Sequence, residues 1–153
     1  MVKKQPVKRG DILEIYVDGA ARKNPGPAAW SFIYVKDDEI IHQKSEYIGD
    51  ATNNTAEYLA IINALQEAEK FSRWDIKVYS DSKLAVNQIN RNWRINYPHL
   101  SDLCNEVYTL CNKYNKVEFY HIGRDNAYIQ KCDKLCNDTL DSKGFKKKNK
   151  KIK

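Results

Sequence analysis

The sequence lacks the features of a membrane protein and of a secreted one. No stretch of its 153 residues approaches the roughly 20 consecutive apolar residues that a membrane-spanning helix needs. The first ten residues, MVKKQPVKRG, are charged and contain no apolar core of the kind found in secretory signal peptides. With 42% hydrophobic and 30% charged residues, the composition is that of a soluble globular domain. We therefore expect a cytoplasmic protein that does not contact a membrane.

Cysteine is scarce, and its spacing argues against a zinc site. The four cysteines form no C-x-x-C pair and have no second cluster of metal-binding residues nearby, so a zinc site is not expected. Spacings of seven and four residues place each pair on one face of a helix. Reduced, buried cysteines are the simpler interpretation, and a disulfide between the two helices is the alternative. These residues are Cys104, Cys111, Cys132 and Cys136.

Negative charge is missing from both ends of the chain. Residues 1–9 carry four basic side chains and residues 143–153 carry seven lysines, with no acid in either segment. Removing these eleven charges from the net charge of +6 leaves −5 on residues 10–142. We expect a basic tail over residues 1–10, a folded domain over 11–142 and a disordered lysine-rich tail over 143–153. Such tails either bind a phosphate backbone or only keep the protein soluble.

The hydrophobic pattern predicts an α/β domain. Three β-rich segments joined by short turns come first and should pair antiparallel. Helical and β segments then alternate, which indicates a five-stranded mixed sheet with helices on both faces. The expected strands are residues 11–17, 28–35, 39–48, 76–80 and 116–122, and the expected helices are 56–71, 82–92, 98–114 and 127–141.

Four acidic residues occupy positions that suit chemistry. Asp18 and Asp81 each follow an apolar strand, and ligands of open α/β sheets bind beyond such strand ends. Glu57 and Asp133 lie on or beside the inward stripes of two predicted helices. Each has an ordinary explanation, such as a turn for Asp18 or a helix cap for Asp81. Four carboxylates brought together would repel one another unless cations bridge them.

The chemistry of such a cluster points to hard divalent cations. Carboxylate oxygens without a matching histidine or cysteine set suit Mg²⁺, with Mn²⁺ as a substitute. Two such ions about 4 Å apart can clamp an in-line displacement at phosphorus. An acidic body that binds a polyanion would also need cations for charge balance.

Four motifs resemble those of the type 1 ribonuclease H family, in its archaeal-type form without a basic protrusion. Residues 16–20 (YVDGA), followed by 24–27 (NPGP), are similar to the first motif, and residues 52–57 (TNNTAE) to the second. Residues 79–82 (YSDS) resemble the third and residues 132–137 (CDKLCN) the fourth. All four occur in the family's order and on the expected kinds of element, over about residues 12–141.

This resemblance implies a ribonuclease H-like fold and a set of site residues. It implies that Asp18, Glu57, Asp81 and Asp133 are metal ligands for two ions. It implies that the RNA strand of an RNA–DNA hybrid is hydrolysed to 3′-hydroxyl and 5′-phosphate ends. RNA would be recognised through its 2′-hydroxyl groups, by Gly19, Asn24, Asn53 and Asn54.

Three residues mark departures from the family pattern. His121, at the end of a predicted strand, resembles the family's mobile catalytic histidine, but its spacing to Asp133 is about two residues longer than usual. Lys83 stands where the family often has glutamine and could reach a phosphate. Trp93, between two arginines in the short segment that replaces the protrusion, could stack on a sugar or base and touch the DNA strand. Packing in the core or at an interface is the alternative.

The sequence thus predicts a monomeric endonuclease for RNA–DNA hybrids without an obligate protein partner. Two alternatives share the fold: a non-catalytic nucleic-acid-binding module and a nuclease that acts on DNA. The complete set of four carboxylates argues against the first, and the asparagines expected to contact 2′-hydroxyls argue against the second.

Overall fold

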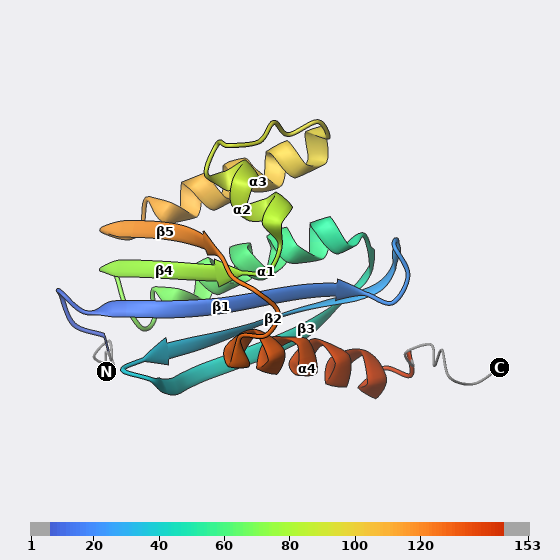
Figure 1. Cartoon of the computed structure of the whole chain (residues 1–153), viewed down its shortest axis with the longest axis horizontal. Helices are drawn as coiled ribbons and strands as arrows, with labels where there is room; N and C mark the ends of the chain where they lie inside the picture. Colours follow the sequence, from blue (N-terminus) through green and yellow to red (C-terminus); the bar gives the residue numbers. More distant parts are fainter. Residues whose placement is uncertain (1–6, 146–153) are drawn as a thin grey trace.

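The computed structural model describes residues 7–145, and its strands and helices follow the predicted order (Figure 1). Five strands form one sheet in the order β3-β2-β1-β4-β5, with the first three antiparallel and β4 and β5 parallel to β1. The predicted mixed sheet is therefore confirmed. Its elements are β1 (Ile12–Ala21), β2 (Gly26–Lys36), β3 (Glu39–Ala51), α1 (Asn53–Ala68), β4 (Asp75–Ser80), α2 (Lys83–Ile89), α3 (Pro98–Cys111), β5 (Lys116–His121) and α4 (Ala127–Ser142).

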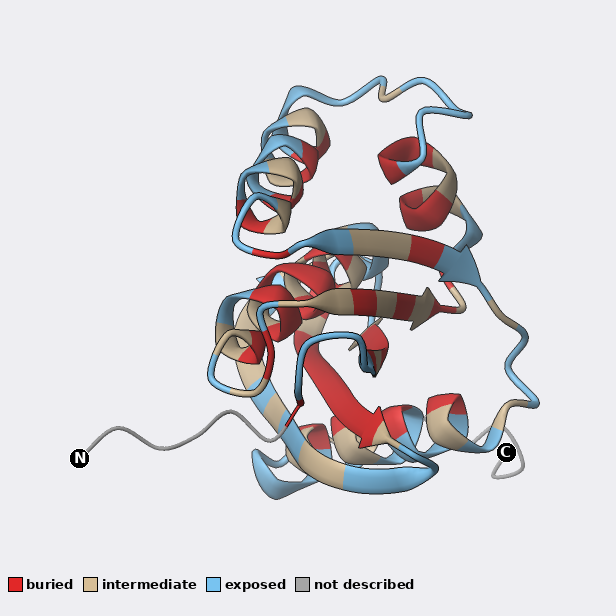
Figure 2. Cartoon of the chain, turned by 90° about the vertical axis from the view of Figure 1, so that its left-hand side faces the viewer, coloured by how far each residue is buried: buried red, intermediate tan, exposed pale blue. Residues whose placement is uncertain are grey.

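Helices cover both faces of the sheet. Helices α1, α2 and α3 lie on one face, and α4 crosses β1, β2 and β3 on the other (Figures 1 and 2). The main core lies between the sheet and α1, where Tyr34 and Tyr58 are fully buried. The Tyr34 hydroxyl donates to the carbonyl of Ala64, so its polar end is satisfied inside the core. A smaller core under α4 contains Ile129 and Cys132.

Strand β1 is longer than the sequence pattern predicts. Residues 19–21 were expected to belong to a turn, but residues 18–21 pair with β2, where Asp18 lies opposite Ser31. The parallel pairing of β1 with β4 stops earlier, at Val17 and Ser80. Asp18 and Asp81 are therefore the first residues beyond the last β1–β4 pair, on neighbouring strands.

Side-chain caps set the starts of α1, which follows β3, and of α2, which follows β4. Helix α1 begins three residues earlier than predicted because Thr52 is its N-cap and accepts from the amide of Thr55. The N-cap of α2 is Ser82, whose hydroxyl accepts from the amide of Ala85. Asp81 is thus not needed as a helix cap, and its carboxylate is left for another role.

The packed body extends past residues 11 and 142 at both ends. Val7 is buried and donates from its amide to the carbonyl of Phe71. Phe145 stacks on Tyr47 with 5.4 Å between ring centroids. The rest of the two expected basic tails, residues 1–6 and 146–153, lies outside the described residues. No helix within residues 7–145 is long and apolar enough to cross a membrane, and the four cysteines are free thiols.

Candidate active site

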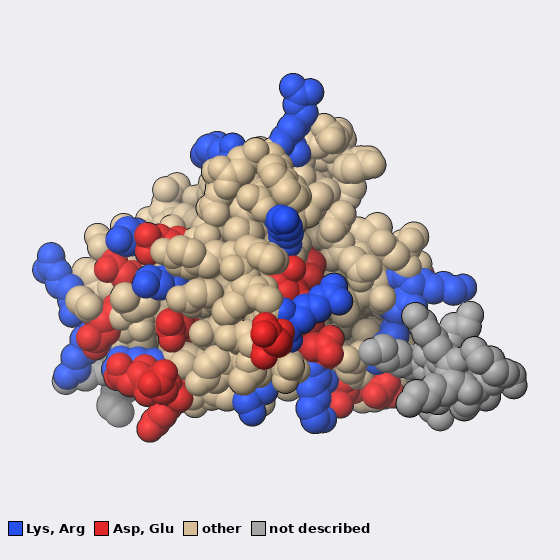
Figure 3. Space-filling view, in the orientation of Figure 1, with Lys and Arg blue, Asp and Glu red and all other residues tan. Residues whose placement is uncertain are grey.

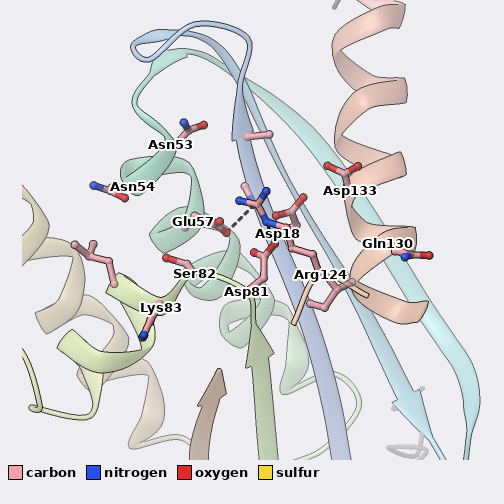
Figure 4. Close-up of a pocket in the computed structure, with 14 residues that line it drawn as sticks. Asp18, Asn53, Asn54, Glu57, Asp81, Ser82, Lys83, Arg124, Gln130 and Asp133 are labelled. Carbon is pink, nitrogen blue, oxygen red and sulfur yellow. Dashed lines mark hydrogen bonds and ion pairs between the residues drawn. The ribbon is translucent and has the colours of Figure 1, made fainter. Parts of the chain in front are cut away.

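Three carboxylates from three different elements meet beyond the last β1–β4 pair. One oxygen each from Asp18 on β1, Glu57 on α1 and Asp81 after β4 lies within 4.8 Å of the others. Figure 4 shows the three side chains pointing toward one another, and Figure 3 shows acidic side chains gathered near the middle of this face. Asp18 is buried, while Glu57 and Asp81 are partly exposed toward a pocket of about 550 Å³.

Gly19 brings helix α1 close enough to complete this triad. Its amide donates to the Glu57 carboxylate over 2.9 Å, which joins the strand to the helix. A Cβ at residue 19 would lie 2.2 Å from the backbone carbon of Ala56, so a larger residue would push the helix away. The absence of a side chain at this position therefore sets the distance between Asp18 and Glu57.

Two serines fix the turn that carries Asp81. The Ser80 hydroxyl accepts from the amide of Ser82 over 3.0 Å, and Ser82 in turn caps α2. The chain thus changes from strand to helix within two residues, and Asp81 stands at the bend. Because this short turn is held by a hydrogen bond, the Asp81 carboxylate has little freedom to move away from Asp18 and Glu57.

Helix α4 carries Asp133 to the opposite wall of the pocket. Its neighbours Cys132 and Cys136 are buried against the sheet, where the Cys132 thiol donates to the carbonyl of Tyr16. The Ser31 hydroxyl of β2 donates to the Cys132 carbonyl over 2.7 Å. The small cysteine side chains let α4 pack closely here, and burial raises the pKa of both thiols. Asp133 lines the pocket but is not part of the 4.8 Å triad.

Burial and mutual repulsion disfavour the charged forms of the triad. Burial, helped by the charges of Asp81 and Asp133, raises the pKa of Asp18 to about 8. Burial and the Asp18 carboxylate raise the pKa of Glu57. The pKa of Asp81 is also raised by burial, although Arg124 opposes this shift. Because the ionised forms of these carboxylates are destabilised, a bound cation would stabilise them.

Arg124, which the sequence analysis did not name, is a basic side chain beside the carboxylates. Its Nε lies 3.4 Å from an oxygen of Asp81, and it lines the pocket. His121 ends β5 with an exposed side chain and does not line the pocket. Arg124 was missed because it lies in a loop without periodicity, although its basic charge close to an expected acidic site was a usable signal.

The predicted substrate-binding residues divide into two groups. Gly19, Asn53, Asn54 and Lys83 line the pocket, together with the unpredicted Gln130. Asn24 and Trp93 do not line it.

Asn24 and Trp93 lie away from the carboxylate pocket. The Asn24 side chain accepts from the amide of Asn53, and the Asn53 side chain accepts from the amide of Ala21, so the β1–β2 turn is joined to α1. Trp93 lines a separate shallow groove between α2 and α3, together with Arg91 and other residues.

Comparison with known proteins places this geometry in a family. The sequence model of the RNase H family matches residues 10–140. The chain belongs to the ribonuclease H family. Ribonuclease HI of Halobacterium salinarum is 37% identical over 134 residues, which make up 87% of this chain and 66% of that protein. A bifunctional protein of Mycobacterium tuberculosis is 33% identical over 131 residues, 84% of this chain and 35% of that protein. The chain thus spans about a third of this mycobacterial relative.

Solved ribonuclease H structures share the fold. The crystal structure of RNase H1 from Halobacterium salinarum superposes with a TM-score of 0.81 and 36% identity, covering 86% of this chain and 98% of that one. LC11-RNase H1, solved in complex with an RNA/DNA hybrid, gives a TM-score of 0.79 at 32% identity, with 86% and 98% covered. The predicted ribonuclease H-like fold is therefore confirmed.

Proposed function

We propose that this protein is an endonuclease that hydrolyses the RNA strand of RNA–DNA hybrids with the help of divalent cations. The main support is the triad of Asp18, Glu57 and Asp81, in which one oxygen from each residue lies within 4.8 Å of the others. The chain also belongs to a family with a member solved in complex with an RNA/DNA hybrid. The LC11 relative supports the hybrid as substrate, because its structure contains one and covers 86% of this chain.

The triad and Asp133 fit the cations that this reaction would use. These four residues offer carboxylate oxygens, which suit Mg²⁺ or Mn²⁺. Asp18, Glu57, Asp81 and Asp133 would together hold two ions. Bound there, the ions would supply an activated water and charge stabilisation at the scissile phosphate, leaving 3′-hydroxyl and 5′-phosphate ends.

Two basic side chains would act on the negatively charged substrate at the pocket. Arg124 is 90% exposed apart from its contact with Asp81, so its guanidinium can reach a phosphate without leaving the carboxylate. Lys83, at the start of α2, lines the same pocket and would contact a neighbouring phosphate. We assign to Arg124 a charge-stabilising role at the phosphate. The part in proton transfer or product release that the resemblance suggests for His121 stays a prediction.

Asparagines at the start of α1 would read the RNA strand. Asn53 and Asn54 line the pocket beside Gly19, and amides can both donate to and accept from a 2′-hydroxyl. The Asn53 oxygen is already engaged with Ala21, which leaves its NH₂ group to donate. Asn24 would act indirectly, since its side chain holds the backbone of Asn53. Stacking by Trp93 on the DNA strand stays a prediction.

A substrate panel tests this function. A labelled RNA–DNA hybrid, an RNA duplex and a DNA duplex are incubated with the protein and Mg²⁺, Mn²⁺ or a chelator. The proposal predicts cuts inside the RNA strand of the hybrid with either metal and none with chelator. Binding without any cutting would identify the non-catalytic alternative, and cutting of the DNA duplex would identify the DNA nuclease. The cytoplasmic location and the monomeric state stay predictions.

A further inference from the structure

The fourth carboxylate is held differently from the other three. Asp133 is exposed on the surface of α4, whereas Asp18 is buried in the sheet. Within residues 7–145 its side chain makes one hydrogen bond, in which the Asn137 Nδ2 donates to its Oδ2 over 3.2 Å. An exposed aspartate on a helix otherwise samples several rotamers, so this bond restricts where the carboxylate points.

The side chain of Asn137 is itself held by an arginine that lies far away from it in the sequence. Arg22, in the turn between β1 and β2, donates from Nη2 to both the side-chain oxygen and the carbonyl of Asn137, each over 3.1 Å. The same guanidinium pairs with Asp141 at 3.1 Å and donates to the carbonyl of Phe145. Only 10% of the Arg22 side chain is exposed, so it is a fixed group with four acceptors around it.

These contacts determine which way the Asn137 amide faces. A guanidinium can only donate hydrogen bonds, so the oxygen of the amide must face Arg22. The NH₂ group must then face the opposite way, toward Asp133, and a carboxylate can accept its hydrogen. Arg22 therefore makes Asn137 a donor toward Asp133, and one Asp133 oxygen is engaged while the other is left for a ligand.

We propose that Arg22 and Asn137 are positioning residues that hold Asp133 for cation binding. This inference rests on the proposed function, because it takes Asp133 as a ligand of the cations. Arg22 acts on Asp133 through Asn137. Arg22 lies in the turn that directly follows β1, the strand that carries Asp18. This turn therefore also determines the orientation of the Asp133 carboxylate on α4. Groups that orient metal ligands commonly change metal affinity or activity 10- to 100-fold when they are removed.

The test is the variant Asn137→Ala. The control is a variant of the neighbouring Lys134–Asp138 ion pair on the same helix. Alanine removes the donor and is a better helix former than asparagine, so the helix is retained. Mg²⁺ affinity of the nucleic-acid-free protein, measured by calorimetry, should fall about tenfold, as should kcat on the hybrid, with KM unchanged. Asp138→Ala breaks the parallel Lys134–Asp138 pair on the solvent side, and we expect wild-type affinity, kcat and KM from it.

A double-mutant cycle shows whether Asn137 acts through Asp133. In an Asp133→Ala background, Asn137→Ala should cause no further loss of Mg²⁺ affinity. Arg22→Lys keeps the charge but loses the planar donor fork, and it should lower Mg²⁺ affinity in the same direction. Wild-type Mg²⁺ affinity in Arg22→Lys would remove Arg22 from the proposal.

The outcomes separate this inference from the proposed function. Mg²⁺ affinity of Asn137→Ala within about twofold of wild type, or an equal loss in the Asp133→Ala background, would overturn the positioning role even if the wild type cuts hybrids. A tenfold loss that disappears in that background would support it even if the wild type failed to cut any hybrid. In that case only the proposed function would be wrong.

Discussion

Asp18, Glu57 and Asp81 differ from Asp133 in how the fold holds them. The three triad residues are fixed by strand pairing, by the Gly19–Glu57 hydrogen bond and by the Ser80–Ser82 turn. Asp133 stands on an exposed helix face and is held by side chains. The triad residues are held by the same strand pairing and hydrogen bonds that form the core. Substitutions at these positions therefore affect folding and chemistry together. The α4 side can be altered with little effect on the core.

Asp81→Asn should give the largest loss of activity and is the first test of this contrast. The asparagine keeps the shape of the turn but removes a negative ligand, so we expect kcat on the hybrid to fall by about 10³-fold. Thermal unfolding and steady-state cleavage with Mg²⁺ are the measurements. Substantial cleavage by a folded Asp81→Asn protein would show that the residue is not a ligand.

Gly19→Ala should damage stability and activity together. Its Cβ would collide with the Ala56 backbone, so α1 must shift and carry Glu57 with it. We expect a loss of about 2 kcal/mol in the free energy of unfolding and a loss of activity of about 10²-fold. Urea unfolding and cleavage assays measure both quantities. A variant as stable and active as wild type would contradict the close approach that builds the triad.

Asp18→Asn should stabilise the metal-free protein at high pH. The pKa of Asp18 is raised to about 8 in the folded state, from 3.8 as its ordinary value. The folded protein therefore holds a proton that the unfolded chain releases, so stability is lost as pH rises from about 4 to about 8. In chelator at pH 8 we expect Asp18→Asn to have a larger free energy of unfolding than wild type, and at pH 4 the difference should be small. Urea unfolding of both proteins at pH 4 and pH 8 measures this, and equal pH dependence would refute the electrostatic argument.

Arg124→Ala should cause a smaller loss, restricted to the chemistry. The residue is exposed and touches the site through Asp81, so we expect kcat to fall about tenfold with the unfolding temperature unchanged. His121→Ala is the matched comparison, and we expect it to lower kcat less than Arg124→Ala does. The reverse order of the two effects, measured under identical Mg²⁺ concentrations, would return the role to His121.

The sequence was sufficient for features that depend on local patterns. Strand and helix order followed from periodicity, and the triad residues could be named because three of the four motifs sit at strand ends or a helix start. The end of β1 was misjudged, because the pairing of Asp18 with Ser31 depends on a partner strand that the local pattern does not show.

Features that depend on contacts across the fold could not be read from the sequence. Arg124 follows Gly123 in a loop, where nothing in the sequence shows that it lies 3.4 Å from Asp81. His121 was named because it resembles the family's histidine at a strand end. Its side chain is exposed at the end of β5, and its role stays a prediction. The link from Arg22 to Asn137 joins residues 115 positions apart, a separation over which no periodic pattern carries information.

The most direct test of the cation site is anomalous diffraction from crystals of the protein soaked with Mn²⁺. We predict a strong anomalous peak in contact with carboxylate oxygens of Asp18, Glu57 and Asp81. A well-ordered site without a peak at saturating Mn²⁺, or a peak only at other residues, would contradict the claim that these three carboxylates form a metal centre.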